Sequence, residues 1–311
     1  MTYQINDIVL ASDLNGFLTT TNNVYGTGTS DRGYGQTSIS QAAVSAGSPI
    51  LASQWANLRN MIVICANHQG SDVSSLAPSD EYIAGQIIHA NEQASPSNNT
   101  YELANNVTLI DTNRLNVSGT SLSTVTNVWT VTKATTWSGS IVGEISVVWS
   151  NEDDARFYFN SGGQIRLHGS QPTGSGHPQD IVWNTSLTTR VGTVKFGVHN
   201  TTNTGSFSGS LSVGYYELTN SYQNVFNGIL ESGGSLYSAD TITIEAKRLN
   251  YVGLHGGNGN GVQFRITFSD AGAHYWSAIN SAGTTFSFDN TKATTFLSGI
   301  LSPAYTTVTP L

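Results

Sequence analysis

The sequence predicts a mainly β protein in which a small helical N-terminal module precedes an antiparallel, jelly-roll-like β-sandwich. From about residue 125 onward, short runs of β-branched and aromatic residues alternate with turn clusters rich in Gly, Asn and Ser. Helical periodicity is confined to the first ninety or so residues. We therefore expect residues 1–95 to form a helical attachment module, 96–125 a linker or connection, and 126–311 the sandwich.

Two helices are expected early in the N-terminal module. Ser12 is a suitable N-cap for the first helix, because apolar residues on one helical face follow it. Ser53 is expected to cap the second, whose apolar stripe includes Trp55 and Leu58 and which Gly70 ends.

A weaker helical pattern covers residues 80–89 and is expected to be capped by Ser79. The polar segment that follows, residues 94–100, contains Pro96 and consecutive asparagines, and it is typical of a linker. The module is too thin to bury a large core alone, so we expect it to pack on the β region, on a copy of itself or on a partner.

The β region contains ten candidate strands between glycine- and asparagine-rich turns. They are residues 128–133, 140–149, 155–159, 164–168, 193–199, 207–216, 241–249, 262–268, 274–279 and 284–288.

Residues 143–167 combine several sequence features that indicate local structure. Two β-type runs flank the acidic cluster Glu152-Asp153-Asp154, and residues 160–163, Asn-Ser-Gly-Gly, supply a tight turn. We interpret the segment as a β-hairpin with a solvated acidic tip. The residues expected in a core or an interface are Trp55, Leu58, Arg156, Phe157, Tyr158 and Phe159, with Arg156 paired to a neighbouring carboxylate.

The charge content argues against nucleic-acid binding. Only 10% of residues are charged, the net charge is −8, and 12 basic residues are spread over the whole chain, so no basic stripe is present to neutralise phosphates. Neutral hydrogen-bonding side chains dominate instead, which favours tight packing against identical copies. The first residues show no signal-peptide pattern and no apolar run is long enough for a membrane span.

Three groups of residues contain side chains that can bind a metal or act as a nucleophile. Cys65 lies in an apolar run and is expected to be an inert buried thiol, although His68 is near in sequence. The acidic cluster lacks the ligand spacing of a calcium loop. His168 and His177 flank a flexible loop without an evident third ligand. We therefore expect no metal, no cofactor and no catalytic residue.

Sequence motifs give no support for an enzyme. The chain has neither a Gly-x-Ser-x-Gly elbow nor a His-Glu-x-x-His motif, and the few strand carboxylates, Glu144, Glu217 and Glu245, suit solvent-facing positions. Five tryptophans of the β region are expected in its core, and exposure of several would favour glycan binding. They are Trp129, Trp137, Trp149, Trp183 and Trp276.

Several phrases of the sequence resemble virion structural proteins of tailed bacteriophages, notably those of marine and cyanobacterial phages. They are Val-Tyr-Gly-Thr-Gly at residues 24–28, Gly-Tyr-Gly-Gln at 33–36, Ile-Leu-Ala-Ser-Gln-Trp-Ala-Asn-Leu-Arg at 50–59, His-Gln-Gly at 68–70 and Asp-Ala-Arg-Phe-Tyr-Phe-Asn-Ser-Gly-Gly-Gln-Ile-Arg at 154–166. The resemblance covers roughly the first 200 residues and includes no catalytic motif.

This resemblance implies a non-enzymatic virion protein that is assembled in the host cytoplasm. The leading hypothesis is a tail fibre or baseplate-peripheral protein that docks through its N-terminal module. Its partners would be other virion proteins of the tail or head and further copies of itself, with a trimer expected because fibres commonly are trimers. The alternatives are a capsid decoration or head-fibre protein, and a module that binds a host surface polysaccharide.

Overall fold

The computed structural model divides into two compact units. Unit 1 comprises Met1–Leu122 with Ala293–Ser298, and unit 2 comprises Ser123–Lys292 with Gly299–Leu311. The structure describes residues 10–26, 33–36, 41–74, 76, 100–174, 176–207, 212–229, 237–253, 257–271, 280–294 and 302–311. The predicted helix at 80–89, the predicted strand at 274–279 and nearly all of the predicted linker at 94–100 lie outside these residues.

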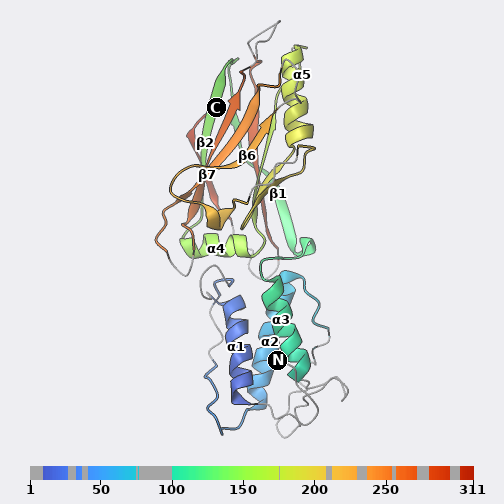
Figure 1. Ribbon diagram of the computed structural model, residues 1–311, viewed down its shortest axis with the longest axis vertical. Coiled ribbons are helices and arrows are strands. Elements are labelled where there is room, and N and C mark those ends of the chain that lie inside the picture. The colour runs from blue at the N-terminus through green and yellow to red at the C-terminus, as the bar shows by residue number, and fades with distance from the viewer. Residues whose placement is uncertain are drawn as a thin grey trace. The chain divides into compact units, whose positions relative to one another are not determined.

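The described helices of unit 1 are α1 (Ala11–Tyr25), α2 (Ala52–Gln69) and α3 (Thr100–Asn113), which lie side by side (Figure 1). Helix α3 falls inside the segment that was expected to be a connection. Helix α2 ends at Gly70, as predicted, and Gly70 adopts a left-handed conformation with φ 71°.

The predicted serine caps of the first two helices are wrong. Helix α1 begins after Leu10, whose N–H donates to the carboxylate of Asp13 at 2.8 Å. Helix α2 begins after Leu51, whose N–H donates to the side-chain oxygen of Gln54 at 2.8 Å. In both helices a polar side chain in the first turn reaches back to the first backbone donor, so a serine side chain is not required there.

The C-terminal ends of the three helices converge on Tyr34. The Tyr34 N–H donates to the carbonyl of Val24 at the end of α1, and its hydroxyl donates to the carbonyl of Arg114 just beyond α3. From the end of α2, the Gln69 side-chain amide donates to the hydroxyl of Tyr34 and to the carbonyl of Ile110. The helices therefore run in the same direction, and these donors satisfy carbonyls that helix ends leave unpaired.

Unit 2 is mainly β and contains two five-stranded antiparallel sheets. The first has the order β1-β9-β3-β4-β5, and the second has the order β10-β2-β8-β7-β6. The strands are β1 (Leu122–Thr132), β2 (Ser140–Val148), β3 (Gln164–Ser170), β4 (Val194–Phe196), β5 (Thr201–Asn203), β6 (Gln223–Ile229), β7 (Thr241–Leu249), β8 (Gly261–Ser269), β9 (Thr285–Ala293) and β10 (Ala304–Thr309).

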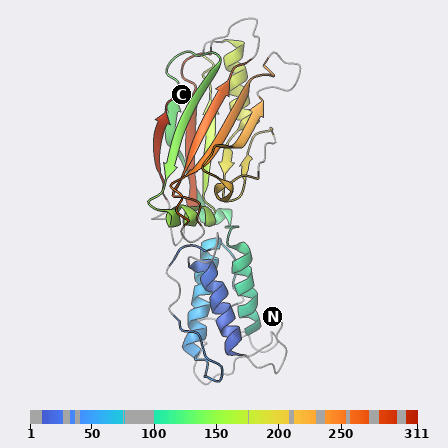
Figure 2. The same cartoon turned by 60° about the vertical axis from the view of Figure 1, so that its left-hand side comes forward.

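Phenylalanine rings join the two sheets. The ring centre of Phe264 on β8 lies 5.3 Å from that of Phe196 on β4 and 6.0 Å from that of Phe288 on β9. Phe268 on β8 contacts Phe286 on β9 in the same way, at 6.0 Å. Burial alternates along β2, β3 and β7, so one face of each strand contributes to this core and the other faces outward. Figure 2 shows the strands of unit 2 as arrows in a second view.

The predicted strand at residues 155–159 is wrong, because these residues form helix α4 (Glu152–Asn160). The side-chain oxygen of Asn151 accepts the N–H of Asp154 at 2.8 Å and so caps the helix. Three acidic residues in the first turn favour the helix through its dipole. The expected hairpin is therefore a strand, a helix and a strand, with Gly162 at φ 79° in the turn before β3.

Helix α5 (Pro178–Thr185) was not predicted, and a π-helical segment, Ser186–Val191, continues it. Its Trp183 packs against Trp137 and Phe268, with ring centres at 5.4 and 5.7 Å. Strands β5, β6 and β10 were also not predicted. The described part of the predicted strand at 207–216 contains the 3₁₀ turn Tyr215–Glu217 and no strand.

Phe264→Ala tests the ring contacts between the sheets. Phe264 is fully buried, so we expect a loss of about 3–5 kcal/mol in unfolding free energy through lost transfer energy and a cavity. Denaturant unfolding of unit 2 measures it, and Val142→Ala on the exposed face of β2 is the control, with a loss below about 1 kcal/mol. Equal losses for the two variants would contradict the packing described.

Candidate functional site

All six residues that were expected in a core or an interface are buried side chains. Trp55 and Leu58 lie in α2 within unit 1, whereas Arg156, Phe157, Tyr158 and Phe159 lie in α4 within unit 2. Tyr158 and Phe159 contact Trp149, and Phe159 also stacks on Tyr215 with ring centres 4.5 Å apart. In each unit these side chains belong to the buried core.

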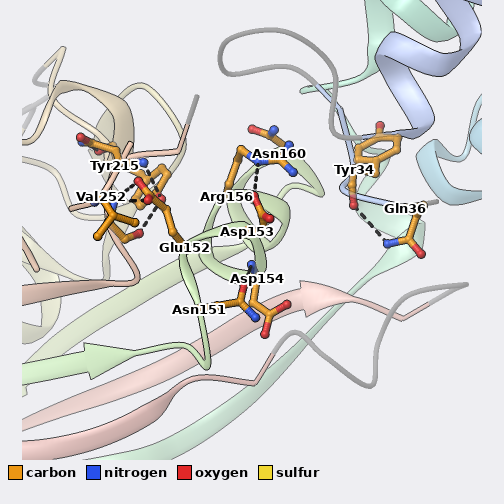
Figure 3. A network of polar contacts seen from close by, with 12 residues as sticks. Tyr34, Gln36, Asn151, Glu152, Asp153, Asp154, Arg156, Asn160, Tyr215 and Val252 are labelled. Carbon is orange, nitrogen blue, oxygen red and sulfur yellow. Dashed lines mark hydrogen bonds and ion pairs between the residues drawn. The ribbon is translucent and has the colours of Figure 1, made fainter. Parts of the chain in front are cut away.

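The acidic cluster of α4 has defined partners and does not form a solvated hairpin tip. Glu152 is only 2% exposed, and Asp153 lies 3.6 Å from the Nε of Arg156. Asp154 supplies the N–H that Asn151 caps, and partial burial raises the pKa of its carboxyl group. Figure 3 shows Glu152 directed away from the other two carboxylates, toward Val252.

Glu152 anchors the segment that follows β7. Its carboxylate accepts the N–H of Gly259 at 2.8 Å and the N–H of Val252 at 3.3 Å. A Cβ at Gly257 would lie 2.5 Å from the side chain of Glu152, so only glycine fits there. The hydroxyl of Tyr215 donates to the carbonyl of Gly259 and accepts the N–H of Asn258. The two ends of the segment are thereby fixed to α4 and to the 3₁₀ turn.

Residues 250–253, which we name the Tyr251 loop, present an aromatic ring to solvent. Tyr251 is 47% exposed, and the guanidinium carbon of Arg248 lies 3.7 Å from its ring centre. The Nε of Arg248 donates to the side-chain oxygen of Asn220 at 2.9 Å, and its Nη1 donates to that of Asn258. Arg248 thus links the Tyr251 ring to the segments that contain Asn220 and Asn258.

The outer face of the second sheet carries a second tyrosine among charged side chains. The guanidinium of Arg265 and the ammonium of Lys247 lie 4.0 and 4.6 Å from the ring centre of Tyr222. The hydroxyl of Tyr222 donates to Glu144 at 2.9 Å, and burial together with Glu144 raises its pKa. Arg265 also pairs with Glu245 at 2.6 Å and stands between Glu144 and Glu245 in the strand register.

Charge is distributed unevenly over the strands. Each of the six inner strands, β2, β3, β4, β7, β8 and β9, contains at least one charged residue. One example from each strand, in the same order, is Glu144, Arg166, Lys195, Glu245, Arg265 and Asp289. The four described edge strands, β1, β5, β6 and β10, contain no Asp, Glu, Lys or Arg. Soluble proteins usually place charges, above all lysine, on edge strands, so this pattern is the reverse of the usual one.

Two of these uncharged edge strands, β1 and β10, lie side by side. The indole N–H of Trp129 on β1 donates to the hydroxyl of Thr307 on β10 at 3.0 Å. Val125 on β1 and Val308 on β10 are both exposed. Asn127 has φ 52° and the register shifts between Thr307 and Thr309, so neither edge is a straight template for another strand. The side formed by β1 and β10 is therefore better suited to side-chain packing against a neighbour than to pairing with an additional strand.

The other residues considered from sequence have structural contacts. Trp137, Trp149 and Trp183 are buried, Trp129 is half-buried, and Trp276 lies outside the described residues. The Nε2 of His168 lies 3.2 Å from Asp289, and His177 immediately precedes α5. Glu217 pairs with His199 at 2.9 Å. In the part of the chain that the structure describes, no group of three His, Cys, Asp or Glu side chains is placed to hold a metal ion.

Comparison of the chain with protein-family models, with curated proteins and with solved structures gave no match. Within the described ranges, no helix combines the length and the apolar character that crossing a membrane requires.

Glu152→Gln tests the anchor of the Tyr251 loop. Glutamine keeps one acceptor oxygen but points an N–H group at a backbone donor, so we expect a loss of about 1–3 kcal/mol in unfolding free energy. Faster hydrogen exchange at the amides of Val252 and Gly259 should accompany it. Asp154→Asn is the matched control and should leave exchange at these two amides unchanged. Unchanged exchange in Glu152→Gln would contradict the anchoring role.

Cys65 provides a test of the core of unit 1. Burial raises the pKa of its thiol to about 12, because the apolar surroundings disfavour the thiolate. We expect no reaction of the folded chain with a disulfide reagent at pH 8, and one thiol per chain after unfolding in guanidinium. Rapid stoichiometric reaction of the folded chain would contradict this burial.

Proposed function

We propose that this chain is a non-enzymatic structural protein of a larger particle. Following the resemblance of its sequence, that particle is a tailed bacteriophage, and the chain is a tail fibre or baseplate-peripheral protein. The observation that carries the proposal is the absence of charge from all four described edge strands. A monomer gains nothing from uncharged edges, whereas a subunit that buries them against neighbours avoids the cost of desolvating charges.

The proposal assigns different tasks to the two units. The helical N-terminal module, with α1 to α3, docks in the particle, and a jelly-roll-like sandwich with β1 to β10 faces outward. The strand order supports the jelly-roll-like connection, because β2 pairs with β8 in one sheet while the next strand, β3, pairs with β9 in the other. The chain therefore changes sheet between β2 and β3 and again between β8 and β9, as wound sandwiches do.

The proposed partners are other virion proteins and further copies of this chain, with a trimer as the proposed form. The uncharged β1 and β10 side suits contacts between copies, because the net charge of −8 would make charged faces of identical subunits repel one another. A capsid decoration or head-fibre protein would use the same surface, so the position in the particle is decided by experiment.

A cryo-EM map of the purified particle tests the proposal most simply. We expect density for the chain in the tail or baseplate, in several symmetry-related copies. Density confined to the capsid would replace the tail assignment with the head-fibre alternative. Absence of the chain from purified particles would overturn the structural role altogether.

A lysine placed on the uncharged edges should block assembly. We expect Val125→Lys and Val308→Lys each to reduce incorporation into particles by at least about tenfold, since burying an unpaired charge costs more than the roughly 1.4 kcal/mol that a factor of ten represents. Quantitative mass spectrometry of purified particles measures it. Ile181→Lys on α5, which is also exposed, is the matched control and should be incorporated normally. Normal incorporation of both edge variants would exclude β1 and β10 as the assembly surface.

A further inference from the structure

The outer face of the second sheet compensates its charges within the chain. In the strand register, Arg265 on β8 stands between Glu144 on β2 and Glu245 on β7. The guanidinium of Arg265 lies 2.6 Å from Glu245, and the ammonium of Lys247 lies 4.6 Å from the ring centre of Tyr222. Opposite charges in facing positions of neighbouring strands stabilise a sheet. This face therefore follows the usual rule of cross-strand pairing.

The outer face of the first sheet instead places two cations opposite each other. Arg166 on β3 and Lys195 on β4 are partners in the strand register. Burial alternates along both strands, with Val194 and Phe196 in the core, so these two side chains project from the outer face. Facing Cβ atoms lie about 4.5–5.5 Å apart, and like charges in such positions destabilise a sheet. Arg166 and Lys195, which we name the cation pair, therefore lower the stability of the isolated chain.

The cation pair has no carboxylate partner in the part of unit 2 that the structure describes. Asp289 stands opposite Arg166 on β9, but it is buried and engaged elsewhere. Its Oδ1 accepts the N–H of Asn127 at 2.9 Å and lies 3.2 Å from the Nε2 of His168. Among the described residues, neither Arg166 nor Lys195 forms an ion pair, and the Nε of Arg166 has no hydrogen-bond partner.

The remaining residues of unit 2 offer few acidic groups. Outside the described residues, unit 2 contains one Asp or Glu, which is Glu231 in the segment after β6 of the second sheet. The neighbours of the cation pair on its own face are neutral and polar. Thr202 on β5 faces Lys195, and Gln164 lies on the same side of β3 as Arg166. The face thus presents positive charge beside hydrogen-bonding groups, in a chain whose net charge is −8.

We propose that the cation pair binds an acidic segment of a partner protein. A carboxylate that lies between Arg166 and Lys195 accepts hydrogen bonds from both and cancels their repulsion. An arrangement that breaks a local rule and costs stability is expected where a functional site requires it. The site lies on the outer face of the first sheet, and it does not depend on the proposed assembly role of β1 and β10.

The form of the surface favours a protein segment over the other anions. Sites for small molecules are concave, whereas the cation pair lies on the face of a pleated sheet between two neighbouring strands. Nucleic acids are bound by stripes of several lysines and arginines, and two cations give few phosphate contacts. An acidic protein segment needs one carboxylate at the cation pair and can use Gln164 and Thr202 for neutral hydrogen bonds.

Fluorescence anisotropy of a labelled oligoglutamate with the full-length chain tests the proposal. We expect saturable binding that weakens with added salt, because the charges involved are partly exposed. Oligoglutamine is the uncharged control peptide and should not bind. Lys195→Gln should lower the affinity by about threefold to fivefold, as expected for the loss of one partly exposed charge contact. Lys247→Gln, at the cation over Tyr222 on the other sheet, is the matched control and should leave the affinity unchanged.

Denaturant unfolding without peptide separates a binding role from a structural one. Lys195→Gln should raise the unfolding midpoint because it removes the repulsion with Arg166, whereas Lys247→Gln should not raise it. Circular dichroism confirms that each variant is folded. A lower midpoint with unchanged affinity in Lys195→Gln would make Lys195 a structural residue and overturn the proposal. Absence of oligoglutamate binding by the unmodified chain would also overturn it. Tighter binding of an oligothymidylate of the same length would assign the face to phosphate groups instead.

Discussion

Packing of phenylalanine rings between the two sheets is the interaction on which the rest of unit 2 depends. Phe264 on β8 touches Phe196 on β4 and Phe288 on β9, so a central strand of one sheet is fixed against two strands of the other. A core of this kind has no place for charge, which moves the charged side chains of the inner strands to outward faces. Strand β7 pairs with β8 up to Leu249, and Arg248 near the end of β7 contacts the ring of Tyr251 in the loop that follows.

The few charged residues of the strands lie on the inner strands and not on the described edge strands. If they were scattered at random, edge strands would carry some of them, yet all four described edges have none. Asn127 and the register shift next to Val308 interrupt two of these edges. The combination avoids open-ended strand addition while leaving a surface that identical neighbours can cover.

The sequence predicts those parts of the fold in which local pattern and tertiary packing agree. Strand β7 has regular alternation and was predicted with its observed bounds, 241–249, and Gly70 correctly marks the end of α2. Helix α4 was missed because its consecutive aromatics favour a strand locally, while the Asn151 cap and burial on all sides decide for a helix. The anchoring of the segment after β7 by Glu152 was not predicted for another reason. Glu152 and Gly259 are 107 residues apart in the sequence, and no local pattern indicates that they are in contact.

Hydrogen–deuterium exchange of the chain, free in solution and within purified particles, measures whether neighbouring subunits cover β1 and β10. We expect the amides of these two uncharged edge strands to exchange more slowly in the particle than in the free chain. The Tyr251 loop should keep the same exchange in both states, since it lies outside the assembly surface. Equal exchange of these amides in the free and assembled states would show that β1 and β10 are not covered by neighbouring subunits.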